Sequence, residues 1–275
     1  MLALKNVTKR FGNCLAVDGV NLEIPAGQMV GVIGRSGAGK STLLRMINRL
    51  VDPSEGSIAF NGVNVSARKG WDLRQWRADC AMIFQQFNLV GRLDVVTNVL
   101  VGRLGRKKTI PSLMKLFSPR ERAMAIAALA RLDMDAFALK RAESLSGGQQ
   151  QRVAIARAMV QDPRILLADE PIASLDPKSA AQVMGALTRI NREEGITVLC
   201  NLHHLRPVKE CCHRVIGMAK GRVVFDGSPA DLTEKTIGNI YGMSLDSREL
   251  AEILDEFEPN KAARTLFEQS MSVAC

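Results

Sequence analysis

Residues 29–47 read MVGVIGRSGAGKSTLLRMI, and this stretch decides the fold. Its first five residues form a continuous apolar run, which predicts a buried strand, and residues 41–47 carry apolar side chains at helical spacing. Between them, residues 34–41 match the phosphate-loop pattern G-x-x-x-x-G-K-[ST]. A strand, a glycine loop and a helix in this order open a nucleotide-binding α/β unit, so we expect a domain of that class.

The residue types of this loop suit phosphate binding. Its glycines let backbone N–H groups curl around phosphates, and the helix that begins near Lys40 directs the positive end of its dipole at them. We expect Lys40 to contact the β- and γ-phosphates of a nucleotide and Ser41 to bind Mg²⁺. A chance glycine-rich loop is the alternative, but the position between a strand and a helix favours the phosphate loop.

Two acids follow a second apolar run. Residues 165–168 predict a buried strand, and Asp169 and Glu170 stand at its carboxyl end, where ligands bind in open α/β sheets. We expect Asp169 to join the shell of the metal, through a water molecule. Glu170 is expected to polarise the water that attacks the γ-phosphate, because hydrolysis needs an oriented nucleophile.

A second glycine-rich helix start lies at residues 145–149, which read LSGGQ and precede a helical run over residues 150–157. Backbone N–H groups at such a helix start also suit phosphate. A plain helix cap and turn is the alternative reading, but the position between a phosphate loop and an acidic strand end favours a role in the site. One chain would then carry two half-sites.

The remaining pattern predicts the architecture around these motifs. Residues 2–11 and 20–24 alternate between apolar and polar side chains, which predicts antiparallel strands, and residues 196–200 predict a further buried strand. Each later strand follows a predicted helix, so a parallel sheet is the simplest arrangement. Further elements are a helix over residues 149–160, a helix over 178–192, a late strand at 223–225, and a mostly helical stretch over 93–161 that is interrupted near 107–119.

These predicted elements group into one domain followed by a tail. Residues 1–242 form one nucleotide-binding domain, with a helical subdomain inserted at about residues 90–161. Residues 243–275 form a C-terminal tail, in which Leu250, Ile253, Leu254 and Phe257 predict one apolar face of an amphipathic helix.

Composition narrows the class of protein. No apolar run approaches the roughly eighteen residues of a membrane-spanning helix, and the first residues lack a signal-peptide pattern, so we expect a cytoplasmic chain that forms no pore itself. The net charge of +9 suits an anionic ligand or a lipid surface, and Arg103, Arg106, Lys107 and Lys108 either face such a partner or are solvated surface. With 4% aromatic residues, nucleic-acid binding is not expected. The six cysteines are expected to be reduced, and their spacing with His203, His204 and His213 matches no common zinc site.

In their order along the chain, these motifs resemble the ABC ATPase family: 34–41, Gln85, 145–149, 165–170, 174–176 and His203. The resemblance covers residues from about 2 to 242. It implies a RecA-like phosphate-loop core with an N-terminal antiparallel β layer and an inserted helical subdomain. It also implies a homodimer that sandwiches two MgATP, in which the signature loop of one protomer caps the ATP held by the other.

The resemblance assigns further residues. Phe11 matches the aromatic that stacks on adenine, Gln85 the residue that contacts Mg²⁺ and the attacking water, and His203 the histidine that faces the γ-phosphate, with His204 as the alternative. Catalysis is thereby assigned to Glu170, His203 and Gln85, and Mg²⁺ to Ser41, Gln85 and Asp169. The nucleotide is assigned to Phe11, Gly34, Arg35, Ser36, Gly37, Ala38, Gly39, Lys40, Ser41 and Thr42, and, from the partner protomer, to Ser146, Gly147, Gly148 and Gln149.

Within the family, several segments resemble the phosphonate-import ATPases: residues 46–50, 101–105, 170–176, 201–203 and 217–227. This resemblance implies integral membrane permease subunits and a periplasmic or extracellular solute-binding protein as partners, with the chain on the cytoplasmic side of the inner membrane. It also implies that residues 101–105 help dock on the permease; packing of the subdomain is the alternative. Two other functions stay open: an accessory ATPase of a carbon–phosphorus lyase complex, and an importer motor for another small solute.

Overall fold

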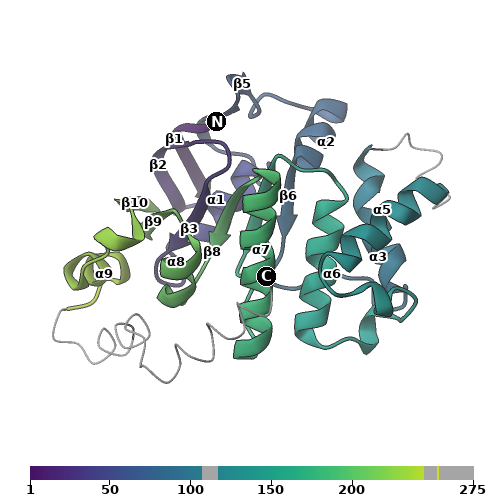
Figure 1. Ribbon diagram of the computed structural model, residues 1–275. Helices are drawn as coiled ribbons and strands as arrows, with labels where there is room; N and C mark the ends of the chain where they lie inside the picture. The colour runs from purple at the N-terminus through teal and green to yellow at the C-terminus, as the bar shows by residue number, and fades with distance from the viewer. Residues whose placement is uncertain (107–116, 245–252, 254–275) are drawn as a thin grey trace.

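The computed structural model describes residues 1–106, 117–244 and 253. A small antiparallel sheet lies on one side of the molecule, a six-stranded sheet runs through its middle, and a group of helices lies on the other side (Figure 1). None of the helices in the described ranges combines the length and hydropathy needed to span a bilayer.

The two sheets match the expected layers. The small sheet has the order β2-β1-β4-β5 and is antiparallel throughout, with β1 (Leu2–Phe11), β2 (Cys14–Ile24), β4 (Glu55–Phe60) and β5 (Val63–Asn64). The large sheet has the order β10-β9-β3-β8-β7-β6. Its strands are β3 (Met29–Ile33), β6 (Cys80–Ile83), β7 (Ile165–Asp169), β8 (Thr197–Asn201), β9 (Arg214–Ala219) and β10 (Arg222–Gly227). Five of these strands are parallel, and β10 pairs antiparallel with β9 at the edge.

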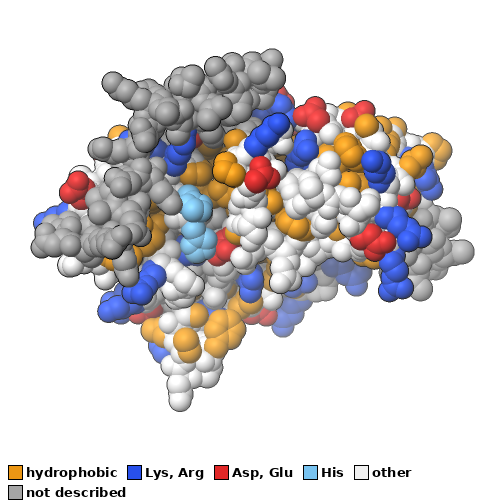
Figure 2. Space-filling model, turned by 90° about the horizontal axis from the view of Figure 1, so that it is seen from below, with side chains coloured by type: hydrophobic (Ala, Val, Ile, Leu, Met, Phe, Trp, Pro, Cys, Tyr) orange, Lys and Arg blue, Asp and Glu red, His pale blue; other side chains and the backbone are white. Residues whose placement is uncertain are grey.

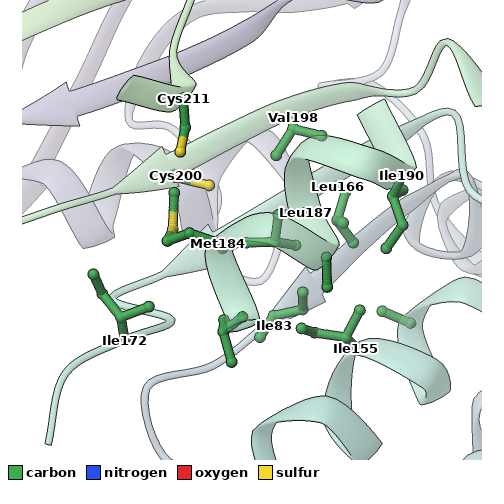
Figure 3. Close-up of a cluster of buried hydrophobic side chains, with 14 of the residues drawn as sticks. Ile83, Ile155, Leu166, Ile172, Met184, Leu187, Ile190, Val198, Cys200 and Cys211 are labelled. Carbon is green, nitrogen blue, oxygen red and sulfur yellow. The ribbon is translucent and has the colours of Figure 1, made fainter. Parts of the chain in front are cut away.

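Alternate residues of the central strands enter two different cores. On β3, Met29 and Ile33 pack into the core under the helices, while Val30 and Val32 pack into the core shared with the small sheet. This period of two explains why the strands read as continuous apolar runs, since both faces of the sheet are covered. Figure 3 shows part of the first core, where Met184, Leu187 and Ile190 of α7 (Pro177–Glu194) face strand residues such as Leu166.

Eight helices are described: α1 (Lys40–Ile47), α2 (Gly70–Asp79), α3 (Val95–Val101), α5 (Pro119–Ala130), α6 (Gly147–Met159), α7, α8 (Leu205–Cys211) and α9 (Glu234–Tyr241). Helices α3, α5 and α6 pack on one another beside the edge strand β6 (Figure 1). The fold thus confirms an α/β core with an N-terminal antiparallel layer and an inserted group of helices.

The stretch between α5 and α6 is less helical than the sequence predicts. It contains only short 3-10 turns, at Asp135–Phe137 and Ala142–Ser144. The carbonyl oxygens of Ala138 and Lys140 instead accept hydrogen bonds, each 2.9 Å long, from the N–H groups of Val96 and Val95. A helix start has N–H groups without intrahelical partners, so this segment helps to cap α3 together with the N-cap residue Asp94.

The segment at residues 101–105 is half-buried and packs against the end of α6. A Cβ atom on Gly102 would lie 2.2 Å from the carbonyl oxygen of Arg157 in α6, so only glycine fits there. Arg103 and Arg106 donate to the carbonyl oxygens of Val160 and Gln161 at 3.0 and 2.5 Å, where cations suit the end of helix α6. Both arginines thus hold this segment against the end of α6. Lys107, Lys108 and most of the predicted tail helix lie outside the described residues; Ile253 contacts the core.

Candidate functional site

The loop at residues 34–39 has a backbone that only glycine can follow at two positions. Gly34 and Gly39 have φ angles of 143° and 100°. A Cβ atom would lie 2.1 Å from the carbonyl oxygen of Met218 at Gly34 and 2.3 Å from that of Ala16 at Gly39. The chain therefore curls tightly from the end of β3 into the first turn of α1, and no side chain stands between its N–H groups and a ligand.

Lys40 begins α1 and is buried. Its Nζ donates hydrogen bonds to the carbonyl oxygens of Gly34 and Arg35 at 2.6 and 3.2 Å, so the ammonium group lies within the curl of the loop. Burial lowers the pKa of Lys40, and the nearby carboxylates of Glu170 and Asp169 act in the opposite direction. A cation held in this place is suited to receive the negative charge of a nucleotide phosphate.

The carboxylate of Asp169 links the loop to the end of β7. It is buried, and its Oδ1 accepts hydrogen bonds from Ser41 Oγ and Asn201 Nδ2, both at 2.7 Å. Its Oδ2 lies 3.4 Å from Nη2 of Arg45, a side chain that is half exposed. Ser41 and Asp169 were both expected to bind one metal, and their side chains are in direct contact.

This pair fits Mg²⁺. A serine hydroxyl and a carboxylate are hard oxygen donors, and Mg²⁺ is usually held by one or two carboxylates together with water and substrate phosphates. Among the described residues, no group of three or more His, Cys, Asp or Glu side chains is arranged to hold a metal ion. A metal at Ser41 would therefore take most of its ligands from phosphate and water, as Mg²⁺ does.

Glu170 and His203 meet at the same edge of the sheet. His203 Nε2 lies 2.6 Å from Glu170 Oε1, and both side chains are partly exposed. Figure 2 shows histidine side chains on this lower face of the molecule, with an acidic side chain beside them. Glu170 has a φ of 53°, a left-handed conformation that is unfavourable for glutamate, so the backbone holds this carboxylate at some cost. His204 follows as the N-cap residue of α8.

The loop at residues 145–149 caps α6. Ser146 Oγ accepts from the N–H of Gln149 at 3.4 Å, and Gln149 Oε1 accepts from the N–H of Ser146 at 2.9 Å, a reciprocal capping box. A Cβ atom on Gly148 would lie 2.6 Å from the Ser179 side chain, so glycine lets α6 approach α7 closely. Within the described ranges, no hydrogen bond or ion pair joins residues 146–149 to residues 34–42. The fold does not bring this loop onto the phosphate loop of its own chain.

Gln85 lies two residues after the end of β6 and is exposed. The segment that follows it is fastened to the helices: Arg157 of α6 donates to the carbonyl oxygens of Phe87 and Asn88 at 2.7 and 2.6 Å. Burial lowers the pKa of Arg157. Asn98 of α3 also exchanges two hydrogen bonds with the backbone of Val90, at 2.8 and 3.1 Å. Gln85 thus stands at the junction between the central sheet and a segment that belongs to the helices.

Phe11 ends β1 and is half exposed, with Nζ of Lys9 4.9 Å from its ring centroid. A flat, exposed ring with a cation over it is available for stacking.

Three residues were not predicted from the sequence: Arg45 and Asn201, which contact Asp169, and Arg157, which holds the segment after Gln85. Arg45 could have been found, since it lies four residues after Ser41 and thus on the same face of α1. Asn201 had a comparable signal, because it is a polar residue at the carboxyl end of a buried strand, as Asp169 is. Arg157 had no local signal, since its partners lie about seventy residues earlier in the chain.

Comparisons with known proteins agree on one family. The model of the ABC transporter family matches residues 17–173 of this chain. A phosphonates import ATP-binding protein of Agrobacterium fabrum (strain C58) is 65% identical over 239 residues, covering 87% of this chain and 84% of that protein. A protein of the same description from Rhizobium meliloti (strain 1021) is 64% identical over 242 residues, 88% of this chain and 87% of the relative.

Solved structures are similar as well. A dimeric ATP-binding cassette in a post-hydrolysis state, bound to ADP and Pi, is 34% identical with a TM-score of 0.74, covering 83% of this chain and 99% of that one. A nucleotide-free ATP-binding cassette from an ABC transporter is 26% identical with a TM-score of 0.76, covering 92% of this chain and 98% of that one.

Proposed function

Because this chain belongs to the ABC transporter ATP-binding protein family, we propose that it is the ATP-hydrolysing subunit of an importer that takes up phosphonates. The observation that carries the ATPase part is the 2.7 Å hydrogen bond between Ser41 and Asp169, which joins the phosphate loop to the acidic strand end. The phosphonate part is supported by the high identity to phosphonates import ATP-binding proteins over most of the chain.

In this function the phosphate loop holds ATP. The N–H groups of residues 34–42 and the ammonium group of Lys40 bind the phosphates, and Phe11 stacks on the adenine. Ser41 would ligate Mg²⁺, Asp169 would hold it through a water molecule, and Gln85 would contact it from beyond the end of β6. Mg²⁺, when bound, supplies positive charge that offsets the charge of the phosphates.

Hydrolysis is assigned to Glu170 and His203. The Glu170 carboxylate accepts a hydrogen bond from the attacking water and orients it in line with the γ-phosphate. His203 Nε2 carries the proton of the 2.6 Å hydrogen bond to Glu170, because a carboxylate can only accept. That bond fixes the direction of the carboxylate. The contact with Glu170 favours His203 over His204 for this role.

Two chains are needed for a complete site. The absence of any bond between residues 146–149 and the phosphate loop, within the described part of the chain, supports a dimer in which these residues act on the partner's ATP. The dimeric solved cassette lends further support. Ser146, Gly147, Gly148 and Gln149 present the N-terminus of α6, which suits the γ-phosphate of the partner's nucleotide.

The remaining partners follow from the phosphonate proposal. Integral membrane permease subunits would carry the solute, and a periplasmic or extracellular binding protein would deliver it. The chain would then work as a peripheral subunit on the cytoplasmic side of the inner membrane. Opening and closing of the dimer would drive the permease.

Deletion of the gene tests this function. The host must lack a second phosphonate importer and keep an intact route for breaking the carbon–phosphorus bond. Deletion should abolish growth on an alkylphosphonate as sole phosphorus source and leave growth on inorganic phosphate unchanged. The wild-type gene should restore growth, whereas a Glu170→Gln gene should not.

Uptake of a labelled alkylphosphonate separates transport from breakdown. The deletion strain should take up none. Normal uptake would overturn the phosphonate-import proposal, and normal uptake with blocked breakdown would point to an accessory ATPase of a carbon–phosphorus lyase. Loss of uptake of a different solute, with phosphonate uptake intact, would assign the motor to another importer.

A further inference from the structure

Asn201 occupies the centre of the site without an assigned role. It is the last residue of β8, and the parallel ladders place it opposite Asp169 on β7 and Val32 on β3. It therefore lies between the strand that carries the metal-binding acid and the strand that leads into the phosphate loop. Its side chain is fully buried.

The orientation of the Asn201 amide is fixed by chemistry. Its nitrogen must face Asp169, because an ionised carboxylate only accepts hydrogen bonds, and the Nδ2–Oδ1 distance is 2.7 Å. Its own Oδ1 is buried and has no hydrogen-bond partner among the described residues. One half of the amide is thus used, and the other half is left unsatisfied.

A buried carbonyl oxygen without a partner is unfavourable, and most buried polar atoms in proteins do have one. The rest of β8 is mainly apolar, so a leucine at this position would suit the surrounding core. The asparagine is therefore explained by its one bond to Asp169 rather than by packing.

That bond acts on the same oxygen that contacts the phosphate loop. Oδ1 of Asp169 accepts from both Ser41 and Asn201, whereas Arg45 reaches the other oxygen from a half-exposed position at 3.4 Å. A buried, short bond is screened less by water than an exposed, long one. Asn201 is thus the donor that most strongly fixes how the carboxylate presents Oδ1 to Ser41.

We propose that Asn201 is a positioning residue that orients the Asp169 carboxylate and thereby raises the affinity of the site for the divalent cation that accompanies ATP. This inference rests on the proposed ATPase function. Hydrogen bonds that orient a metal-associated group commonly change metal affinity by ten- to a hundredfold. Because Asn201 is also two residues from His203, the test must measure metal binding apart from hydrolysis.

The test replaces Asn201 with leucine and measures binding of Mn²⁺ by electron paramagnetic resonance, with a non-hydrolysable ATP analogue present. The expected result is a rise of about tenfold in the Mn²⁺ Kd, with binding of the analogue in EDTA unchanged. The Tm should change little, because removal of the unsatisfied carbonyl oxygen offsets the loss of one hydrogen bond to Asp169, which keeps its bond from Ser41.

Asn191→Leu is the matched control. Asn191 is also buried, but its Nδ2 donates to the carbonyl oxygens of Gly27 and Ile196, at the opposite end of β8. This variant should lower the Tm and leave the Mn²⁺ Kd unchanged.

Asn201→Ala provides a second variant if the leucine variant does not fold, and the same tenfold change is expected of it. An unchanged Mn²⁺ Kd in the folded variant would overturn the proposal for Asn201. If the Kd of the analogue in EDTA rises as much as the Mn²⁺ Kd, the proposal is also overturned, because the residue would then support the whole site. Failure of the wild-type chain to bind the analogue would instead contradict the proposed ATPase function.

Discussion

The bond between Glu170 and His203 predicts that the two residues act as a unit in hydrolysis. Replacement of Glu170 by glutamine keeps the shape of the side chain but removes the charge that polarises water, and loss of a general base typically lowers kcat by about 10²- to 10⁴-fold. The 2.6 Å bond involves an ionised carboxylate, for which about 1.5–3 kcal/mol is typical. Since the His203 side chain is 39% exposed, water weakens the bond, and about 1–2 kcal/mol of coupling remains.

A double-mutant cycle measures this coupling. The kcat of ATP hydrolysis is determined for the wild type, Glu170→Gln, His203→Ala and the double variant, with ATP binding measured for each. The double variant should be about 5- to 30-fold more active than the product of the two single effects predicts, which corresponds to a coupling of about 1–2 kcal/mol. ATP affinity should stay close to wild type in Glu170→Gln. Additive effects on kcat would refute the reasoning, as would near wild-type hydrolysis by Glu170→Gln.

Three further variants test the phosphate loop and the dimer. Lys40→Ala should raise the Kd for MgATP by at least about tenfold, because a charge-assisted contact to the phosphates is lost, and an unchanged Kd in equilibrium binding would count against the assignment. Lys40→Ala chains mixed with Ser146→Arg chains should regain partial ATPase activity, since one composite site of the mixed dimer is intact; no recovery at any ratio, with heterodimers shown by cross-linking, would contradict pairing in trans. Gly39→Ala should lower the free energy of unfolding by about 2–4 kcal/mol, from left-handed strain and the close contact with Ala16, whereas Gly12→Ala, with open space around it, should cost only about 1 kcal/mol. If urea denaturation shows the same loss of unfolding free energy in Gly39→Ala and Gly12→Ala, the close contact with Ala16 is unimportant.

Local pattern was enough to predict most of the central sheet. Strands β3 and β7 are covered on both faces, so nearly all of their residues are apolar and the runs are easy to recognise. Strand β9 is buried over its four middle residues, but it was not among the strands expected from the sequence. Its apolar run contains Gly217, where a Cβ atom would lie 2.6 Å from the side chain of Ile240 in α9, a close approach that only the fold reveals.

The site residues, like the strands, were predicted where the signal is local in sequence and missed where the partners are distant. The phosphate loop and the acids at residues 169 and 170 were predicted because each is a short motif whose chemistry depends on neighbours in sequence. Arg103 and Arg106 show the limit of such reasoning. Their charges predicted either an anionic partner or plain solvated surface, but they bind carbonyl oxygens at the end of α6, more than fifty residues later in the chain. A run of charges gives no information about partners at that separation.

The way Arg157 holds the segment after Gln85 has a consequence for sequence variation. Its two bonds go to the main-chain carbonyl oxygens of Phe87 and Asn88, which every amino acid possesses. Substitution at these two positions therefore leaves the attachment available, apart from the preference for Asn or Gly that the φ of 51° at residue 88 imposes. The path of this segment between sheet and helices thus depends on its main chain and on Arg157, and the attachment places no further demand on the side chains at residues 87 and 88.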